Sequence, residues 1–548
     1  MIYSSRWKRL QVRLGLMMLV LAALMLSAVM APRAAYAHAS VVQATPEADS
    51  KFQDSPSEVK ITFNERLDDG LFYIKVFDHT GREATHNQAQ MSAEHTAVQL
   101  ALPKLREGVY LISYHVISAD GHPVGGSYPI TIGNPPQEDR LNLPVTSSHQ
   151  HGGSGPVTTK DMLQYASRGL WYLAVLALAG WVIWLRLPAQ GGAEARKAVG
   201  SWTLNLQRVH LITLLLLIFT HVEDLLGDGG VQDLWRLFSA TSVGVSWLLL
   251  LIISLVGFAV VGRWAGLDVV FAVALLAAKS FSGHAASFEP QWATIGLDFI
   301  HLAAAALWVG GLILLAVKWR NQSQALNSFL RAFSNMALLS IIVLTVTGAI
   351  SVLLFLPNLH YLLYSSWGTL LFVKIGLVLL VAIVGMIIRL YLRKQQEQMA
   401  KLWLKVDLTL MIIIVAVVGI LTYVAPIPSN QPLNWHQMGE KVHVSADITP
   451  KVQGTNTFVA KVWLPEQSGT PKQVQMILNY QDDKSIAPIS VPIVPFDDKT
   501  MEDSYGLKKY SYKVSGAYLP FRGNWDLEMR VMDQDDNETV YHKTFIVY

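Results

Sequence analysis

The sequence of 548 residues contains no cysteine, and only 15% of its residues are charged. The absence of cysteine excludes disulfide frameworks and thiolate metal sites, so any metal ion must be held by nitrogen, carboxylate or thioether groups. The hydrophobic fraction of 52% is too high for an ordinary soluble protein of this length. The net charge of +3 gives no support for nucleic-acid binding, and the sequence has no phosphate-binding loop motif. These absences favour a polytopic membrane protein with several domains.

Residues 1–37 have the features of a secretory signal peptide. Basic residues precede an apolar run from 14 to 31, and the small-x-small triplet Ala35-Tyr36-Ala37 follows that run. Cleavage after Ala37 would make His38 the first residue of the mature chain. Because the apolar run is long for a signal peptide, an uncleaved membrane anchor is the alternative.

The regions on either side of the apolar part of the chain have the pattern of β-domains. Short alternating stretches between turn residues predict a small all-β sandwich over 38–133. Residues 134–160 are rich in Pro, Gly, Ser and His, which predicts a flexible linker. Alternating stretches return after Pro428 and predict a second all-β sandwich over 437–548.

Eight long apolar stretches predict an all-α transmembrane domain over 161–428. Lys and Arg are concentrated in the loops after the odd-numbered spans, and the other loops are acidic, so the positive-inside rule places the odd-numbered loops in the cytoplasm. We therefore expect a multi-pass plasma-membrane protein whose N-terminal and C-terminal domains are both extracytoplasmic. The expected spans begin near Leu163, Val209, Val243, Leu267, Ile295, Phe333, Trp367 and Val406.

The mature N-terminus and one later segment together predict a metal site. A free N-terminal His38 offers its α-amine and a ring nitrogen to one ion, which suits the square arrangement that Cu(II) prefers. Asp120 and His122 are two residues apart, and side chains at that spacing point to the same face of an extended strand. An amine, two imidazoles and one carboxylate form a Cu(II) ligand set. The alternative is that Asp-Gly-His-Pro is only a turn, since these residues are common turn formers.

The start His38-Ala-Ser and the block from 114 to 124, Tyr-His-Val-Ile-Ser-Ala-Asp-Gly-His-Pro-Val, resemble the CopC family. The resemblance covers about 38–133 and implies that His38, Asp120 and His122 bind Cu(II). A methionine-rich Cu(I) site, as described for some CopC-like domains, is not expected, because Met91 is the only methionine in this range. The other histidines of the domain are expected to have no metal role; these are His79, His86, His95 and His115.

Several polar groups lie in or beside the apolar spans, where they are costly unless they are paired or functional. Asp298 and His301 are three residues apart on one helix face, which suits joint coordination, or a carboxylate that orients a ligating imidazole. With His284 they form the candidate membrane metal site, and His221 and Glu223 are weaker candidates. The alternative is that these are interfacial side chains that snorkel toward water.

Two lysines and two glycines within the spans are expected to have structural or gating roles. We expect Lys279 and Lys374 to be structural ion-pair or gating residues, since an intramembrane cation usually pairs with a carboxylate or lines a polar cavity. Gly310-Gly311 predicts a site of close helix packing.

The blocks Ser282-Gly-His-Ala285 and 298–311 resemble the CopD family of copper-resistance membrane proteins, and the resemblance extends over about 163–425. The segment 523–531, Gly-Asn-Trp-Asp-Leu-Glu-Met-Arg-Val, resembles YtkA-like domains. The order CopC-like, CopD-like, YtkA-like is similar to that of YcnJ-type fusions, which implies copper uptake. The histidines of the last domain show no metal-ligand spacing, so we expect a docking or structural role for that domain; they are His436, His443 and His542.

The leading hypothesis is a copper-binding membrane protein, not an enzyme, that captures Cu(II) outside the cell and imports it. We expect Cu(II) at the N-terminal domain and Cu(I) or Cu(II) in the membrane domain. The expected partners are the lipid bilayer, copper ions and another extracytoplasmic copper protein. The alternatives are copper sequestration or sensing without transport and, as a minor alternative, a copper oxidase, in which Asp120 would reduce the access of oxygen to the metal.

Overall fold

The structure is a computed structural model of the whole sequence. The predicted signal peptide, His38 and most of the predicted linker lie outside the residues that it describes. The described residues are 41–46, 50–63, 65–135, 158–187, 200–227, 229–320, 326–356, 359, 361–424, 426, 430, 432–439, 442–496, 498 and 507–548.

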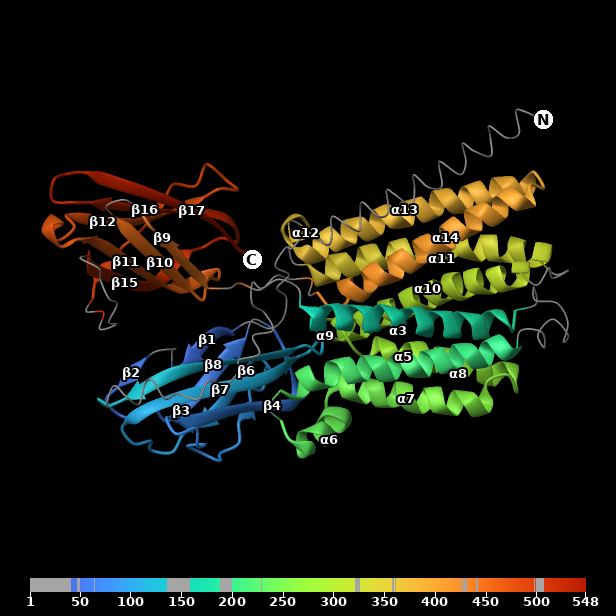
Figure 1. The fold of residues 1–548 in the computed structure, drawn as a ribbon, viewed down its shortest axis with the longest axis horizontal. Coiled ribbons are helices and arrows are strands. Elements are labelled where there is room, and N and C mark those ends of the chain that lie inside the picture. Colours follow the sequence, from blue (N-terminus) through green and yellow to red (C-terminus); the bar gives the residue numbers. More distant parts are fainter. Residues whose placement is uncertain are drawn as a thin grey trace. The chain divides into compact units, whose positions relative to one another are not determined.

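The N-terminal domain is a β-sandwich of two four-stranded sheets (Figure 1). The strand order is β1-β3-β6-β5 in one sheet and β2-β8-β7-β4 in the other. In β3 the apolar residues Val59, Ile61 and Phe63 alternate with polar residues and are buried, as the sequence pattern predicts. The strands are β1 (Val41–Thr45), β2 (Lys51–Phe52), β3 (Glu58–Phe63), β4 (Leu67–Asp78), β5 (Gln90–Met91), β6 (Ala97–Ala101), β7 (Gly108–Ser118) and β8 (Pro123–Ile132).

The hairpin between β7 and β8 carries two of the predicted metal ligands, Asp120 and His122. The strands pair antiparallel as far as Ile117 and Pro123. Residues 119–121 form a turn, so the prediction that the two ligands share the face of an extended strand is wrong. The segment thus begins with the turn that its residue types favour. The turn itself brings the carboxylate and the imidazole together.

The central domain is helical, as predicted (Figure 1). Polar side chains cap several helices; for example, Thr158 and Asp161 form a capping box at the start of α3. The helices are α3 (Thr159–Trp184), α5 (Gly200–Leu226), α6 (Val231–Ala240), α7 (Ser242–Val260), α8 (Ala265–Ser280), α9 (His284–Ser287), α10 (Gln291–Arg320), α11 (Leu326–Phe355), α12 (Tyr361–Tyr364), α13 (Ser366–Arg393) and α14 (Glu397–Leu421).

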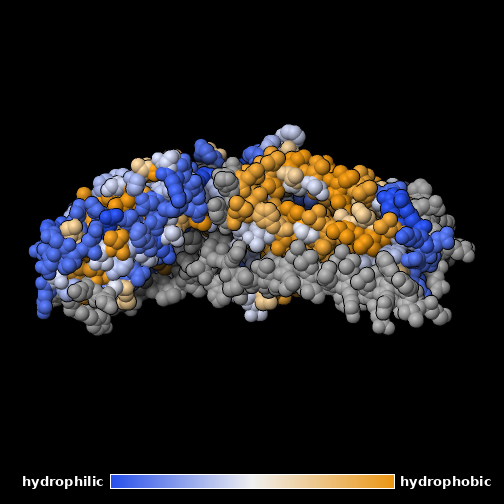
Figure 2. Space-filling model, turned by 90° about the horizontal axis from the view of Figure 1, so that it is seen from above, coloured by the Kyte–Doolittle hydropathy of each residue, from blue (hydrophilic) through white to orange (hydrophobic). Residues whose placement is uncertain are grey.

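Seven helices among the described residues are long and apolar enough to cross a membrane: α3, α5, α7, α10, α11, α13 and α14. The fourth expected span, near Leu267, corresponds to α8, which has 16 residues and therefore a length of about 24 Å, less than the hydrocarbon core of a bilayer. Large apolar side chains such as Leu353, Leu379 and Met386 are exposed on the helical domain, and its surface is broadly hydrophobic (Figure 2). The protein is a multi-pass membrane protein.

Helix α3 lies at the centre of the helical domain and packs against α5, α8, α10 and α14. At Gly180 an added Cβ would lie 1.7 Å from the carbonyl oxygen of Ala306, and at Gly310 it would lie 2.4 Å from the backbone of Gly180. Only glycine therefore allows α3 and α10 to approach so closely. The predicted close packing at Gly310-Gly311 is confirmed.

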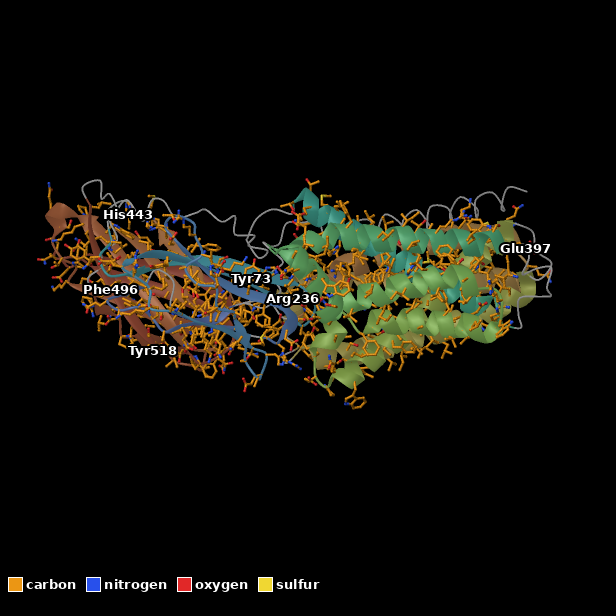
Figure 3. The ribbon with its side chains drawn as sticks, turned by 90° about the horizontal axis from the view of Figure 1, so that it is seen from below. Tyr73, Arg236, Glu397, His443, Phe496 and Tyr518 are labelled. Atoms are coloured by element: carbon orange, nitrogen blue, oxygen red, sulfur yellow. The ribbon has the colours of Figure 1, made fainter. Side chains whose placement is uncertain are left out.

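The short helix α6 packs against β4 of the N-terminal sandwich; Figure 3 labels Arg236 of α6 and Tyr73 of β4. Asp68 Oδ2 accepts hydrogen bonds from the backbone nitrogen and the hydroxyl of Ser242, both at 2.8 Å. These contacts hold β4 to the start of α7.

The C-terminal domain is a second two-sheet β structure, as predicted. The strand orders are β14-β15-β11-β10-β9 and β13-β12-β16-β17. Its core includes Phe458, Val462, Trp525 and Leu527, all fully buried. The strands are β9 (Leu433–Gln437), β10 (His443–Thr449), β11 (Gly454–Pro465), β12 (Gln473–Tyr480), β13 (Ile489–Val491), β14 (Val494–Pro495), β15 (Leu507–Leu519), β16 (Gly523–Met532) and β17 (Glu538–Val547).

Candidate metal centre

The β7–β8 turn is held by a compact set of hydrogen bonds around Ser118. The Ser118 hydroxyl donates to the Asp120 carboxylate and accepts from the backbone nitrogen of His122 at 3.3 Å. Gly121 has a φ of 87°, and a Cβ there would lie 2.0 Å from Val243 Cγ2 of α7. The turn therefore requires glycine for its backbone conformation and for its contact with the helical domain.

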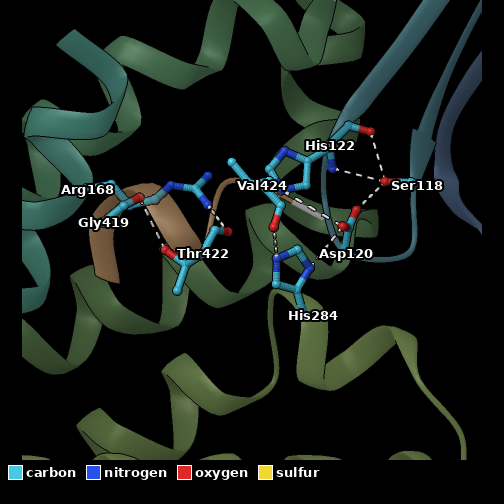
Figure 4. Close-up of polar contacts among 8 residues, drawn as sticks. All are labelled: Ser118, Asp120, His122, Arg168, His284, Gly419, Thr422 and Val424. Atoms are coloured by element: carbon cyan, nitrogen blue, oxygen red, sulfur yellow. Dashed lines mark hydrogen bonds and ion pairs between the residues drawn. The ribbon is translucent and has the colours of Figure 1, made fainter. Parts of the chain in front are cut away.

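Asp120, His122 and His284 form a buried carboxylate–imidazole group, which we call the turn cluster (Figure 4). His284 Nδ1 lies 3.1 Å from Asp120 Oδ2, and His122 Nε2 lies 3.9 Å from the same oxygen. The two imidazole rings are stacked with their centroids 6.1 Å apart. All three side chains are at most 10% exposed. One carboxylate oxygen is thus shared by an imidazole of the N-terminal sandwich and an imidazole of the helical domain.

His284 is the first residue of α9, directly after Gly283, and its second ring nitrogen, Nε2, lies 3.2 Å from the carbonyl oxygen of Val424. The Val424 carbonyl accepts a hydrogen bond from Nε2–H, which directs Nδ1 towards Asp120, where a bound ion would take the place of the hydrogen bond between Nδ1 and the carboxylate. The contact with the Val424 carbonyl fixes the direction of the His284 ring.

The residues around the turn cluster are aromatic and cationic. The ring of Tyr423 meets the His122 ring edge-on at 5.1 Å, and burial raises the pKa of the Tyr423 phenol, so this group stays neutral. The Arg168 guanidinium lies over the same tyrosine ring and donates to the Thr422 carbonyl at 2.8 Å. Its positive charge also acts on Asp120. An arginine in an apolar span is a signal of a polar site that the sequence analysis missed.

The predicted ligand His38 lies outside the described residues. Among those that are described, no group of three or more His, Cys, Asp or Glu side chains is arranged to hold a metal ion. The turn cluster is instead closed by the bond between His284 and Asp120. The two predicted ligands Asp120 and His122 are brought together, and binding of an ion requires that this bond opens.

A cavity of about 510 Å³ begins at the turn cluster and extends among the membrane-spanning helices. Asp120, His122 and His284 line it, and so do Asp298, His301 and Lys374 farther along the chain. His284, Asp298 and His301 therefore line the same cavity as Asp120 and His122, but these residues do not form one group.

Lys279, Asp298 and His301 form a second polar group on the cavity wall, which we call the helix cluster. Lys279 Nζ lies 3.0 Å from Asp298 Oδ2, so the ion pair expected for Lys279 is confirmed. His301 Nδ1 lies 2.8 Å from the Thr347 hydroxyl. Asp298 is therefore paired with a cation, and the partner that orients His301 is a threonine of α11 and not Asp298.

The two weaker candidates differ from each other. His221 is buried and lines the cavity, with Nδ1 2.9 Å from the carbonyl oxygen of Leu217, and its ring lies 6.3 Å from that of Tyr423. Glu223 has a side chain that is 77% exposed and lies 3.4 Å from Lys160 Nζ. Only His221 has the surroundings of an intramembrane ligand.

Comparison with known families assigns two parts of the chain. Residues 41–133 match the CopC domain, and residues 327–425 match Copper resistance protein D. The second match covers α11 to α14 and does not include His284, Asp298 or His301, although the sequence resemblance was expected to extend over about 163–425.

The chain is similar to the Copper transport protein CutJ of Bacillus subtilis, with 26% identity over 94% of this chain and 97% of the relative. It is also 26% identical to Protein YobA of Escherichia coli, over 18% of this chain and 80% of that protein. Among solved structures, CopC from Methylosinus trichosporium OB3b is 31% identical, covering 17% of this chain and 93% of its own, with a TM-score of 0.17. PcoC, a methionine-rich copper resistance protein from Escherichia coli, is 22% identical, covering 18% of this chain and 99% of its own, with a TM-score of 0.16. The chain is therefore a multi-pass membrane protein in which residues 41–133 match the CopC domain and residues 327–425 match Copper resistance protein D.

Proposed function

We propose that this protein captures Cu(II) at the turn cluster and passes copper along the cavity into the membrane domain, and that the net movement is import into the cell. Copper is the cargo in this proposal and not a resident cofactor. The observation that carries the proposal is the sharing of Asp120 Oδ2 between His122 of the sandwich and His284 of the helical domain.

Capture uses the ligands of the N-terminal domain. After signal cleavage, His38 would supply an amine and an imidazole, and Asp120 and His122 would supply a carboxylate and a second imidazole. Such a set of hard and intermediate donors suits Cu(II). The bond from Ser118 to Asp120 keeps the carboxylate in place while the ion binds.

Transfer begins when His284 replaces one of these ligands. Because His284 Nδ1 lies 3.1 Å from the ligating carboxylate, an ion on Asp120 is already within reach of that nitrogen. The Val424 carbonyl keeps Nδ1 aimed at Asp120 during the exchange. From His284 the cavity leads to His221 and to the helix cluster, so further imidazoles and one carboxylate line the route.

Import is favoured over export by three considerations. The chain has no phosphate-binding loop to power export. The domain order resembles that of fusions that imply uptake, and the relative that spans nearly the whole chain is named a copper transport protein. The predicted signal peptide and the distribution of positive charge among the loops favour a capture domain outside the cell.

Copper accumulation in cells tests this proposal. A strain that lacks the gene is complemented with the wild type, with the double variant D120N/H122N, or with H86N, which changes an exposed histidine of the same sandwich. We expect the wild type and H86N to restore copper accumulation under copper scarcity and the double variant to fail at equal protein level. Equal accumulation with the double variant would contradict capture at the turn cluster.

Sequestration without transport is the second candidate, and the Lys279–Asp298 ion pair favours it. A lysine ammonium already occupies the carboxylate on the cavity wall, so a cation that enters from the turn cluster meets a positive charge. Sequestration predicts that loss of the protein makes cells more sensitive to excess copper without lowering the copper content of starved cells. Uptake predicts that loss of the protein lowers the copper content of starved cells and does not make cells more sensitive to excess copper.

A further inference from the structure

The C-terminal domain carries two histidines that meet on the outer face of its five-stranded sheet. The register pairs His436 of β9 with Ser445 of β10, two residues from His443. His443 and Ser445 alternate with the buried Val444, so the two histidines share the outward face. Their ring centroids are 6.5 Å apart. The sequence spacing of seven residues gave no sign of this, because cross-strand pairing creates the proximity.

A third ring completes the cluster. Trp463 of β11 pairs directly with His443, and its ring lies 5.5 Å from that of His436. His436 is exposed and His443, which is labelled in Figure 3, is half-buried. The indole is thus in ring contact with His436 and belongs to the strand residue paired with His443.

The ring nitrogens of this pair are available. Among the described residues, neither His436 nor His443 makes a hydrogen bond or an ion pair, whereas His542 on the other sheet has Nδ1 2.9 Å from Asp526 Oδ2. Two imidazoles bound to one ion at about 2 Å have their centroids about 6 Å apart or closer. Because the observed separation is 6.5 Å, a small side-chain rotation brings both rings onto one ion.

A methionine follows His436 closely in the sequence. Met438 directly follows β9 and is two residues after His436, the spacing at which side chains of an extended segment point to the same side. Its side chain is 69% exposed, so an ion from solvent can reach it. Imidazole and thioether groups are the donors that suit Cu(I), and the chain has no cysteine that would compete.

We propose that His436, His443 and Met438 form a Cu(I) site on the C-terminal domain. This site goes beyond the proposed function, because its ligands are separate from the turn cluster and from the cavity. The chain then holds copper at two places of different ligand softness: nitrogen and carboxylate donors in the N-terminal sandwich, and nitrogen and sulfur donors in the C-terminal one. The Trp463 ring lies close enough to contribute a cation–π contact to the bound ion.

The test counts Cu(I) ions bound to the full-length protein in detergent micelles without oxygen. Cu(I) is supplied as its acetonitrile complex and competes with bicinchoninate. The wild type is compared with H436A/H443A, with M438L and with the control H542A. We expect the histidine double variant to lose one equivalent, M438L to weaken that equivalent on the order of tenfold, and H542A to match the wild type. Because Met438 is exposed, M438L reports on the site even if the double variant folds poorly.

Equal Cu(I) binding by the wild type, H436A/H443A and M438L would overturn the proposal, and so would an equal loss in H542A. The same series in a D120N/H122N background separates this site from the turn cluster. A C-terminal equivalent that persists in that background supports the site whatever the fate of the uptake proposal. Loss of the equivalent with the turn-cluster substitutions alone would contradict an independent site.

Discussion

The turn cluster and the helix cluster face one cavity and use similar side chains, but the charge beside each carboxylate differs. Asp120 Oδ2 lies 3.1 Å from a ring nitrogen of His284 and 3.9 Å from one of His122, whereas Asp298 Oδ2 lies 3.0 Å from the ammonium of Lys279. An imidazole exchanges its proton for a metal ion readily, while an ammonium has no lone pair and must first move away. The presence of a carboxylate therefore does not by itself indicate a cation site. The group beside the carboxylate determines whether an ion can bind there.

This difference assigns separate roles to the two clusters within the proposed pathway. The turn cluster is suited to capture, because an arriving ion takes the place of a hydrogen bond between an imidazole nitrogen and the Asp120 carboxylate. The helix cluster is suited to control, because the ion must displace Lys279 from Asp298 in a site with little water. The substitutions below test that assignment, and they are ordered by the size of the expected effect.

The largest expected effect is the loss of the intramembrane ion pair. Lys279→Met leaves Asp298 without its partner, and breaking a buried pair costs about 3–5 kcal/mol of stability. The double variant K279M/D298L removes both charges and should recover most of that loss. Thermal unfolding in detergent micelles measures both. A single variant as stable as the wild type would show that the pair does not hold the carboxylate, and the contrast between the clusters would fail.

The matched change in the turn cluster is smaller. His284→Asn removes one hydrogen bond to Asp120 without removing a permanent countercharge, so it should cost about 1 kcal/mol in the same unfolding measurement. A cost as large as that of Lys279→Met would erase the difference that we draw between the clusters.

The contact between the turn and α7 gives the next effect. Gly121→Ala should lower stability by about 1–3 kcal/mol, because alanine is strained at a φ of 87° and its Cβ would overlap Val243. Adding Val243→Ala should recover the part of the stability loss that comes from the steric overlap. The part that comes from backbone strain should remain. Unchanged unfolding and unchanged Cu(II) affinity in Gly121→Ala would mean that the turn does not rest against α7.

Lys451 provides a smaller, pH-dependent comparison with Lys279, because its Nζ has a carbonyl partner, Ile546, at 3.0 Å in place of a carboxylate. Burial lowers the pKa of Lys451 to about 8 from its usual 10.5. Above pH 8 the unfolded chain then binds more protons at this residue than the folded chain, so stability rises with pH, by about 1 kcal/mol between pH 8 and 9. Hydrogen exchange of β17 in wild type against K451M should show this slope only in the wild type. Parallel pH profiles of hydrogen exchange in the wild type and K451M would contradict a role of Lys451 in the pH dependence of stability.

The sequence predicted the parts of this protein that depend on local pattern. Alternation gave the two β-domains, and length and hydropathy identified the helical spans. The Asp120–His122 pair could be found because it lies within a few residues of one turn. Helix α8 was predicted as a span because it is apolar, but Ser280 and the following turn end it after 16 residues.

The features that depend on tertiary contact were not predicted. His284 was grouped with Asp298 and His301 because all three lie in one stretch of sequence, yet its carboxylate partner is Asp120, 164 residues away. The partner of Lys279 was not identifiable because several carboxylates follow it in the sequence. The His436–His443 pair depends on the β9–β10 register, and a shift of one residue would place these rings on opposite faces.

The proposal that the sandwich passes copper to the helical domain is tested most directly at His284. Cells that express His284→Asn are compared with the wild type for copper accumulation under scarcity, and the purified proteins are compared for Cu(II) affinity. We predict that the variant keeps its Cu(II) affinity within a few-fold, since His38, Asp120 and His122 remain, but accumulates no more copper than cells without the protein. Wild-type accumulation by His284→Asn would contradict transfer through the turn cluster.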